Sequence, residues 1–105
     1  MKHLDDIELH DALIHRAEID YPKQTIRVEI EFYPSPQAPK RKRGVIAFDG
    51  VRSISHTADL VHIKRNAFAG TINYWAPAKK DGVTFIYLVN GVISVTAKKV
   101  SFKGA

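Results

Sequence analysis

The sequence contains no cysteine, and this absence excludes several kinds of chemistry. A disulfide framework and a thiolate metal site are both impossible, and no cysteine nucleophile is available. Because structural disulfides belong mainly to oxidising compartments, a chain without cysteine fits the cytoplasm. We therefore expect a cytoplasmic protein whose stability depends on an apolar core.

Long apolar runs are also missing. No segment approaches the roughly 18 consecutive apolar residues that span a bilayer, so we expect no membrane partner. Residues 1–6 have no signal-peptide pattern. With 105 residues, the chain is long enough for one core and too short for two. We expect a polar, loosely attached N-terminal segment over residues 1–10 and a single β domain over residues 11–105.

Recognisable catalytic motifs are absent as well. The six glycines are scattered singly, and they form neither a phosphate-binding loop nor a dinucleotide fingerprint. On a strand, His10 and His15 would point to opposite faces because they are five residues apart. We therefore expect no enzymatic activity, no cofactor and no metal site.

The clearest pattern that is present is the alternation of residues 25–32. Ile26, Val28, Ile30 and Phe32 are apolar, and the residues between them are polar or charged. Successive side chains of a strand point to opposite faces, so this segment buries one face and wets the other. Such alternation is typical of an antiparallel sheet that covers a core on one side.

Other segments fit the same architecture. Residues 11–20 match either a helical stripe or a strand, and the turn at residues 21–24 favours a strand. We predict separate strands at 45–48 and 51–55, at 92–97 and 98–103, and at 60–64. In total we expect seven or eight short strands at roughly ten-residue spacing. The predicted fold is all-β and mainly antiparallel, either a β-sandwich or a small barrel.

Asn90-Gly91 is the strongest turn signal in the chain. This pair suits a type I′ hairpin turn, in which Leu88 would lie opposite Ile93. The inner face of that hairpin would then be aliphatic. We assign to it the four residues Ile86, Leu88, Ile93 and Val95.

The opposite face of the same hairpin is too apolar for bare solvent. It carries Phe85, Tyr87, Val89 and Val92, and we expect a loop, the N-terminal segment or a second subunit to cover it. Aromatic residues are enriched in protein interfaces. The candidate interface residues are Tyr74, Trp75, Phe85, Tyr87 and Val89.

Charge suggests a second type of partner. The net charge is +5, although the first 20 residues carry six acidic residues and only two basic ones. Lys40, Arg41, Lys42 and Arg43 form a basic run, and Lys79, Lys80, Lys98 and Lys99 follow later. Such residues can neutralise phosphates, although no groove-entering helix or stacking motif accompanies them. Binding of an anion or nucleic acid is therefore the alternative hypothesis.

Three segments resemble a loose group of small bacterial all-β proteins. They are His10-Asp11-Ala12, the alternating strand at 25–32 and the closing segment 91–97. Most members of this group have no assigned function, and some are similar to immunity proteins that neutralise toxins. The resemblance implies a cytoplasmic, non-catalytic binding or assembly module with a protein partner or self-association, and it carries over no binding residues.

Overall fold

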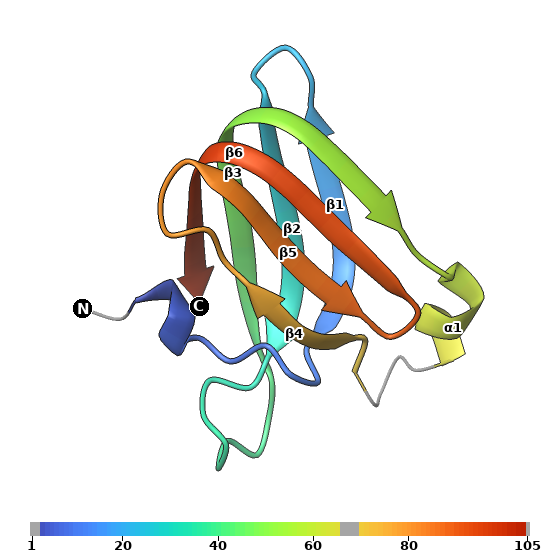
Figure 1. Ribbon diagram of the computed structural model, residues 1–105. Helices are drawn as coiled ribbons and strands as arrows, with labels where there is room; N and C mark the ends of the chain where they lie inside the picture. The colour runs from blue at the N-terminus through green and yellow to red at the C-terminus, as the bar shows by residue number, and fades with distance from the viewer. Residues whose placement is uncertain (1–2, 66–69, 105) are drawn as a thin grey trace.

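The computed structural model describes residues 3–65 and 70–104. These residues form one antiparallel sheet of six strands in the order β1-β2-β3-β6-β5-β4 (Figure 1). The elements are a 3₁₀ turn (Leu4–Asp6), β1 (Leu13–Asp20), β2 (Thr25–Phe32), β3 (Lys42–Thr57), α1 (Leu60–Arg65), β4 (Ile72–Ala76), β5 (Gly82–Leu88) and β6 (Gly91–Gly104). The all-β, antiparallel prediction is confirmed.

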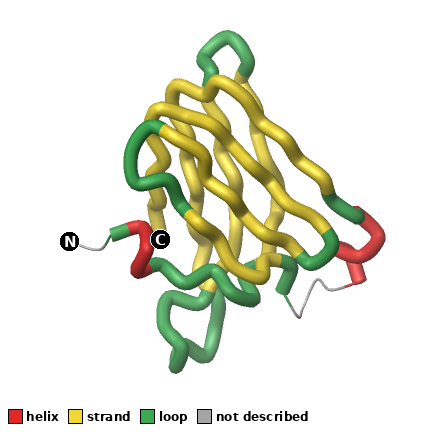
Figure 2. The backbone as a smooth tube through the Cα atoms, in the orientation of Figure 1, coloured by secondary structure: helices red, strands yellow, loops and turns green. Residues whose placement is uncertain are grey.

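Two long strands, β3 and β6, give the sheet its shape. They pair along most of their length, from Gly44 opposite Gly104 to Thr57 opposite Val92. Both strands curve strongly, so that β1 and β2 lie behind β4 and β5 (Figure 2). The sheet thus folds over on itself into two layers around a common interior. It does not close, because β1 and β4 remain its two edges.

The strand number differs from the prediction because two expected breaks are bends. At the first, Gly50 has a positive φ of 62°, and the pairing with β6 is irregular between Val51 and Ser53. These features bend β3 without ending it. The second lies near Lys98-Lys99, where the chain changes face, since both lysines are exposed beside the buried Ala97. Strand β6 nevertheless continues through it.

The predicted strand at 60–64 is wrong, because these residues form α1. Asp59 precedes the helix, and its carboxylate accepts a hydrogen bond from the backbone N–H of His62 at 3.0 Å. An aspartate in this position satisfies an otherwise unpaired N–H of the first helical turn. The ambiguous segment at 11–20 forms a strand, β1, from Leu13 onward.

The core lies between the two layers. Ile26, Val28 and Ile30 of β2 are at most 1% exposed, and Phe32 is 8% exposed, as the alternation predicts. The inner face of the β5–β6 hairpin is also confirmed, because Ile86, Leu88, Ile93 and Val95 are all buried. The other buried apolar residues are Leu9, Ala12, Ile46, Phe48, Ile72, Trp75 and Ala97.

The β5–β6 hairpin has a different register from the predicted one. Leu88 lies opposite Gly91, and Ile86 lies opposite Ile93, so the two turn residues are Val89 and Asn90. Asn90 has a positive φ of 63°, and Gly91 does not. Gly91 serves a different purpose, because a Cβ there would lie 2.2 Å from the carbonyl oxygen of Thr57. Gly91 thus lies close to the end of β3. The turn is formed by Val89 and Asn90, one residue earlier than the predicted turn at Asn90-Gly91.

The N-terminal segment is better packed than expected. Leu9 is fully buried, and the indole Nε1 of Trp75 donates to the carbonyl oxygen of Ile7 at 2.9 Å. The backbone N–H of Asp11 donates to the carbonyl oxygen of Ile72 at 2.9 Å. Residues 7–12 therefore cover the free edge of β4.

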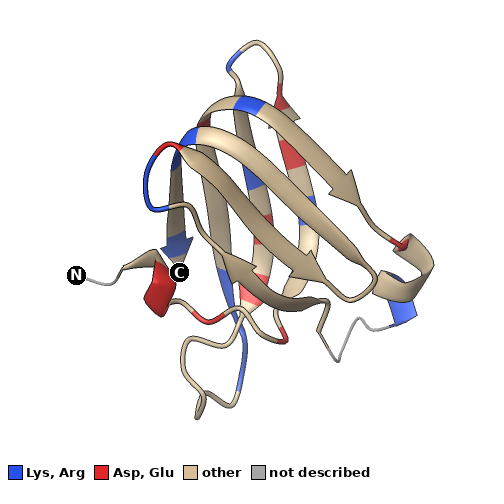
Figure 3. Ribbon diagram, in the orientation of Figure 1, with Lys and Arg blue, Asp and Glu red and all other residues tan. Residues whose placement is uncertain are grey.

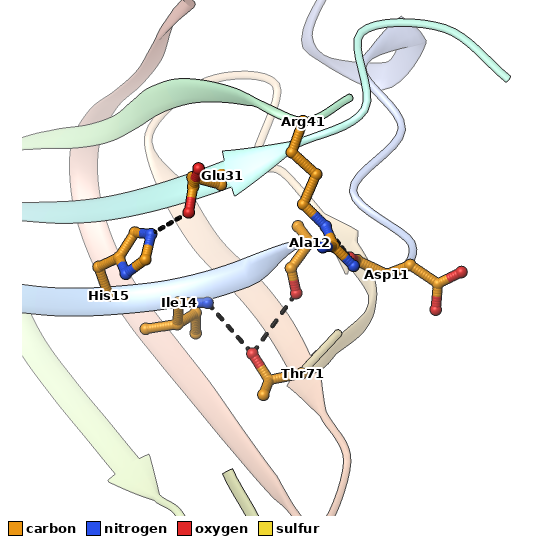
Figure 4. A network of polar contacts seen from close by, with 7 residues as sticks. All are labelled: Asp11, Ala12, Ile14, His15, Glu31, Arg41 and Thr71. Carbon is orange, nitrogen blue, oxygen red and sulfur yellow. Dashed lines mark hydrogen bonds and ion pairs between the residues drawn. The ribbon is translucent and has the colours of Figure 1, made fainter. Parts of the chain in front are cut away.

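Thr71 connects this covered edge to the beginning of β1. Its hydroxyl accepts from the backbone N–H of Ile14 at 3.1 Å and donates to the carbonyl oxygen of Ala12 at 3.4 Å (Figure 4). Thr71 is 2% exposed, so water cannot easily replace these contacts. The hydroxyl therefore holds the first residues of β1 next to the first residues of β4.

Candidate functional site

The outer face of β4 and β5 carries a row of aromatic side chains. Tyr74 is 52% exposed, Phe85 is 37% exposed and Tyr87 is half-buried. Cross-strand pairing brings them together, because Tyr74 lies opposite Tyr87 and Phe85 follows on the same face. Val83 and Val92 extend this apolar surface on β5 and β6. We call this surface the aromatic face: Tyr74, Val83, Phe85, Tyr87 and Val92.

The ring geometry limits what the aromatic face can bind. The rings of Tyr74 and Tyr87 stack with centroids 4.5 Å apart, and those of Phe85 and Tyr87 stack at 5.9 Å. Tyr87 is thus the middle ring, and both of its neighbours stack on it. Binding of a sugar or a base by stacking requires a free ring face. The central ring does not offer one, so the row is better suited to packing against apolar side chains.

The strand residues beside the aromatic face on β6 and the second half of β3 carry no charge. The residues that pair along the outer side of β6 and the second half of β3 are small and hydroxylated. They are Ser53, Ser55, Thr57, Ser94 and Thr96. Figure 3 shows this region of the sheet in tan, without the blue and red of charged residues. A surface rich in aromatic residues and depleted in charge has the composition of the centre of a protein interface.

Two of the predicted interface residues do not share this surface. Trp75 is 8% exposed and lies in the core, because the pairing of β4 with β5 is irregular between Ile72 and Tyr74. That irregularity turns Trp75 inward beside its neighbour Tyr74. Val89 is half-buried in the hairpin turn, where its backbone N–H donates to the carbonyl oxygen of Thr71 at 3.0 Å.

No described segment covers Phe85 or Tyr74, although we expected a cover from within the chain or from a second subunit. The N-terminal segment packs on the edge of β4 and contacts Trp75 on the opposite side. With respect to residues 3–65 and 70–104, the aromatic face is therefore accessible.

The outer face of β1 and β2 has the opposite character. Arg16 forms ion pairs with both Glu18 and Glu29, and these contacts raise the pKa of its guanidinium. Nε2 of His15 lies 2.6 Å from a carboxylate oxygen of Glu31 (Figure 4). These side chains are largely exposed. They form a solvated, charged surface, visible as alternating red and blue in Figure 3.

The candidate anion-binding residues do not form one patch. Lys40, Lys42 and Arg43 are exposed around the beginning of β3. Lys98 and Lys99 lie where β3 and β6 bend, with Lys99 opposite Asp49. Asp49 lies six positions after Arg43 along β3, and at 3.3 Å per residue this corresponds to about 20 Å. Each group could contact phosphates only on its own end of the molecule.

Arg41 is engaged in local structure within the basic run. Its Nε donates to the carbonyl oxygen of Asp11 at 3.1 Å (Figure 4). Its guanidinium lies 4.7 Å from the ring centroid of Tyr33. These contacts attach the loop between β2 and β3 to the N-terminal segment. An open hollow of about 780 Å³ lies between these two segments. It is lined in part by Asp6, Glu8 and Asp11, so its electrostatic preference is for cations.

An ion pair supports the bend of β3. The guanidinium of Arg52 bonds both carboxylate oxygens of Asp81, at 3.1 and 2.5 Å. The hydrogen bond from Arg52 lowers the pKa of Asp81, and the positive charge of Lys98 adds to this effect. The pair connects the bend to the loop before β5, at one end of the aromatic face.

Several contacts of this architecture are not visible in the sequence. The hydroxyl of Thr71 joins residues about 57 positions apart, and no local pattern marks it. The Arg16–Glu29 pair could be found only from the hairpin register of β1 and β2. By contrast, the aromatic residues of β5 are marked in the sequence by the lack of alternation in residues 83–88.

The helical elements within residues 3–65 and 70–104 are the 3₁₀ turn (Leu4–Asp6) and α1 (Leu60–Arg65). Within these ranges, no helix is long and apolar enough to cross a bilayer. No group of three or more histidine, aspartate or glutamate side chains in the same ranges is arranged to hold a metal ion.

Comparison with known proteins adds no relative. No protein-family model matches this chain, and no curated protein or solved structure gives a match. Function must therefore be inferred from the surfaces described above.

Proposed function

We propose that this protein is a non-catalytic binding module that docks a protein partner on its aromatic face. The main support is the exposed row of Tyr74, Phe85 and Tyr87 on a face without charged residues. Large apolar patches on a single chain are typical of interaction sites. Aromatic side chains contribute much of the binding energy in protein interfaces.

The pattern of β5 supports the same proposal. Its outer residues Val83 and Phe85 are apolar, and so are the inner residues Ile86 and Leu88. Strands with apolar residues on both faces usually occur in sheets that are covered on both sides. Residues 7–12 cover only the edge of β4, so a partner would supply the missing layer.

The type of partner follows from the resemblance to small bacterial proteins, some of which are similar to immunity proteins. A cytoplasmic toxin neutralised by docking is therefore the partner class that we propose. A toxin gene beside the gene for this protein would identify the partner to test.

The experiment compares two exposed tyrosines. Tyr74 lies on the aromatic face, whereas Tyr21, which is 79% exposed, lies in the turn between β1 and β2. We expect Tyr74→Ala and Phe85→Ala to lower the affinity for the product of the neighbouring gene by about tenfold or more each, measured by titration calorimetry. Tyr21→Ala serves as the control and should bind like the unmodified protein.

Salt separates this proposal from anion binding. Binding through the aromatic face should change little with ionic strength, whereas binding of phosphates by lysine and arginine weakens steeply. The proposal would be refuted if Tyr74→Ala and Phe85→Ala bound normally. A strong salt dependence together with loss of binding on Arg43→Ala would favour the basic loop as the binding site.

A further inference from the structure

The outer edge of β1 is open. Its residues from His15 to Asp20 are all exposed, and among the described strands β1 pairs with β2 alone. At the beginning of this edge, the N–H of Ile14 donates to the hydroxyl of Thr71. The opposite edge of the sheet is covered by residues 7–12. An open strand edge is a template for pairing with another strand.

The charges on the outer face of this edge form two rows that cross from β2 to β1. In one row Glu29 lies opposite Arg16, and in the other Arg27 lies opposite Glu18. On the far side of β2, both rows end at uncharged residues of β3. Acid and base therefore alternate along β1 as well as across to β2. At the open edge, the pattern ends with Arg16 and Glu18.

The charges along this edge are complementary to those of an identical edge rotated by 180°. We propose that β1 pairs with β1 of a second copy in antiparallel register, with the two-fold axis at Ala17. Arg16 then lies opposite Glu18 of the second copy, and Glu18 opposite its Arg16. Each row continues as Glu29, Arg16, Glu18 and Arg27 across the two chains. Opposite charges on directly opposed strand residues stabilise a pair.

Neighbouring two-fold registers each place like charges in directly opposed positions, although an axis at Glu18 would also bring Arg16 opposite Asp20 at the end of β1. An axis at Glu18 would place the two Glu18 side chains opposite each other, and an axis at Arg16 would do the same with two arginines. Like charges in directly opposed positions are destabilising. Charge therefore selects the register centred on Ala17, within the regularly paired part of β1 that follows the irregularity at His15.

The inner face of β1 agrees with this arrangement. Ala17 and Ile19 lie opposite the buried residues Val28 and Ile26 of β2, yet both are exposed, Ile19 by 42%. They are exposed because no described segment lies over this end of the open sheet. In the proposed dimer, the small Ala17 side chains meet at the axis on this inner face. This surface is separate from the aromatic face.

The residue on the axis provides the test. Ala17→Lys and Ala17→Asp each place two like charges opposite each other and leave the charged rows intact. We expect sedimentation equilibrium of the unmodified chain, from micromolar to millimolar concentration, to show a monomer–dimer equilibrium. Each variant should raise the dissociation constant by about fivefold or more. An equimolar mixture of the two variants should restore dimerisation, because lysine then faces aspartate.

Ala76, exposed on β4, is the matched control, and Ala76→Lys should dimerise like the unmodified chain. Hydrogen exchange of the unmodified chain adds a test that needs no variant, since amide protection in Arg16–Asp20 should rise with protein concentration. A monomer at all concentrations would overturn the proposal. So would a dimer insensitive to charge at Ala17, a mixture that fails to associate, or dissociation by Ala76→Lys.

Discussion

Strands β2 and β5 both have an apolar inner face, but their outer faces differ in polarity. Both bury alternate aliphatic residues between the two layers, for example Ile30 and Ile86. On the outer side, β2 carries Arg27, Glu29 and Glu31, which water solvates, whereas β5 carries apolar and aromatic residues. The inner residues are explained by folding alone. The outer residues of β5 are not, and this difference indicates a surface that serves a purpose other than the stability of the single chain.

The largest effects should separate the two faces of β5. Ile86→Ala removes a fully buried side chain and should lower the free energy of unfolding by about 2–5 kcal/mol. Phe85→Ala, at the adjacent position, should lower it by about 1 kcal/mol or less, because Phe85 is 37% exposed. Urea denaturation measures both values. Comparable losses would show that the aromatic face is part of the structural core and would remove the contrast with β2.

A moderate effect is expected at the contact between the covered edge and β1. Thr71→Val keeps the shape of the side chain and removes the hydroxyl that accepts from Ile14. A buried N–H without its partner should lower the free energy of unfolding by about 1–3 kcal/mol. In this variant, amide hydrogen exchange should be accelerated more at Ile14 than in the middle of β2. Unchanged exchange at Ile14 would mean that the two edges do not depend on this hydroxyl.

Smaller effects should follow on the charged face of β1 and β2. Arg16→Ala removes the ion pairs with Glu18 and Glu29, all on exposed or partly exposed side chains. Exposed pairs contribute about 1 kcal/mol or less, and salt screens them. Thermal unfolding at low and high salt should show the difference shrinking as salt rises. A large, salt-independent loss would mean that the charged face is as structural as the core.

The smallest effect should depend on pH. The pKa of Asp81 is lowered in the folded protein by its hydrogen bond to Arg52, so the ionised form stabilises the fold. This contribution is complete above the ordinary pKa near 3.8 and is lost as pH falls through the lower folded value. Asp81→Asn should therefore be less stable than the unmodified chain at neutral pH, and the gap should narrow in acid. A gap that widens in acid would contradict this assignment.

The sequence predicts the inner faces of this fold well and its interruptions poorly. Alternation in β2 and the aliphatic residues of β5 and β6 identify the core, because burial imposes a period of two on a strand. The bend at Gly50 resembles a turn in the sequence, since Asp-Gly is a common turn pair. Only its pairing with β6, some 50 residues later in the chain, shows that strand β3 continues through Gly50. Residues 60–64 are apolar enough for a strand or a helix, and the hydrogen bond that the Asp59 carboxylate accepts from His62 favours the helix.

The candidate surface was predictable in part. Its central residues Phe85 and Tyr87 stand out because both faces of β5 are apolar. Trp75 was placed on the wrong side, since an irregularity in pairing changes the face of every later residue in a strand. The basic residues illustrate the same limit, because one group lies at the beginning of β3 and the other lies beside its bend.

The position of β6 affects how the chain can fold during synthesis. This strand is the last of the six in chain order, yet it lies in the middle of the sheet between β3 and β5. Until residues 91–104 have left the ribosome, the β1–β2–β3 unit and the β4–β5 unit have no strand to join them. Non-local pairing of this kind slows folding and leaves apolar surface uncovered in the meantime. Nascent chains that stall before residue 91 should therefore depend on chaperones.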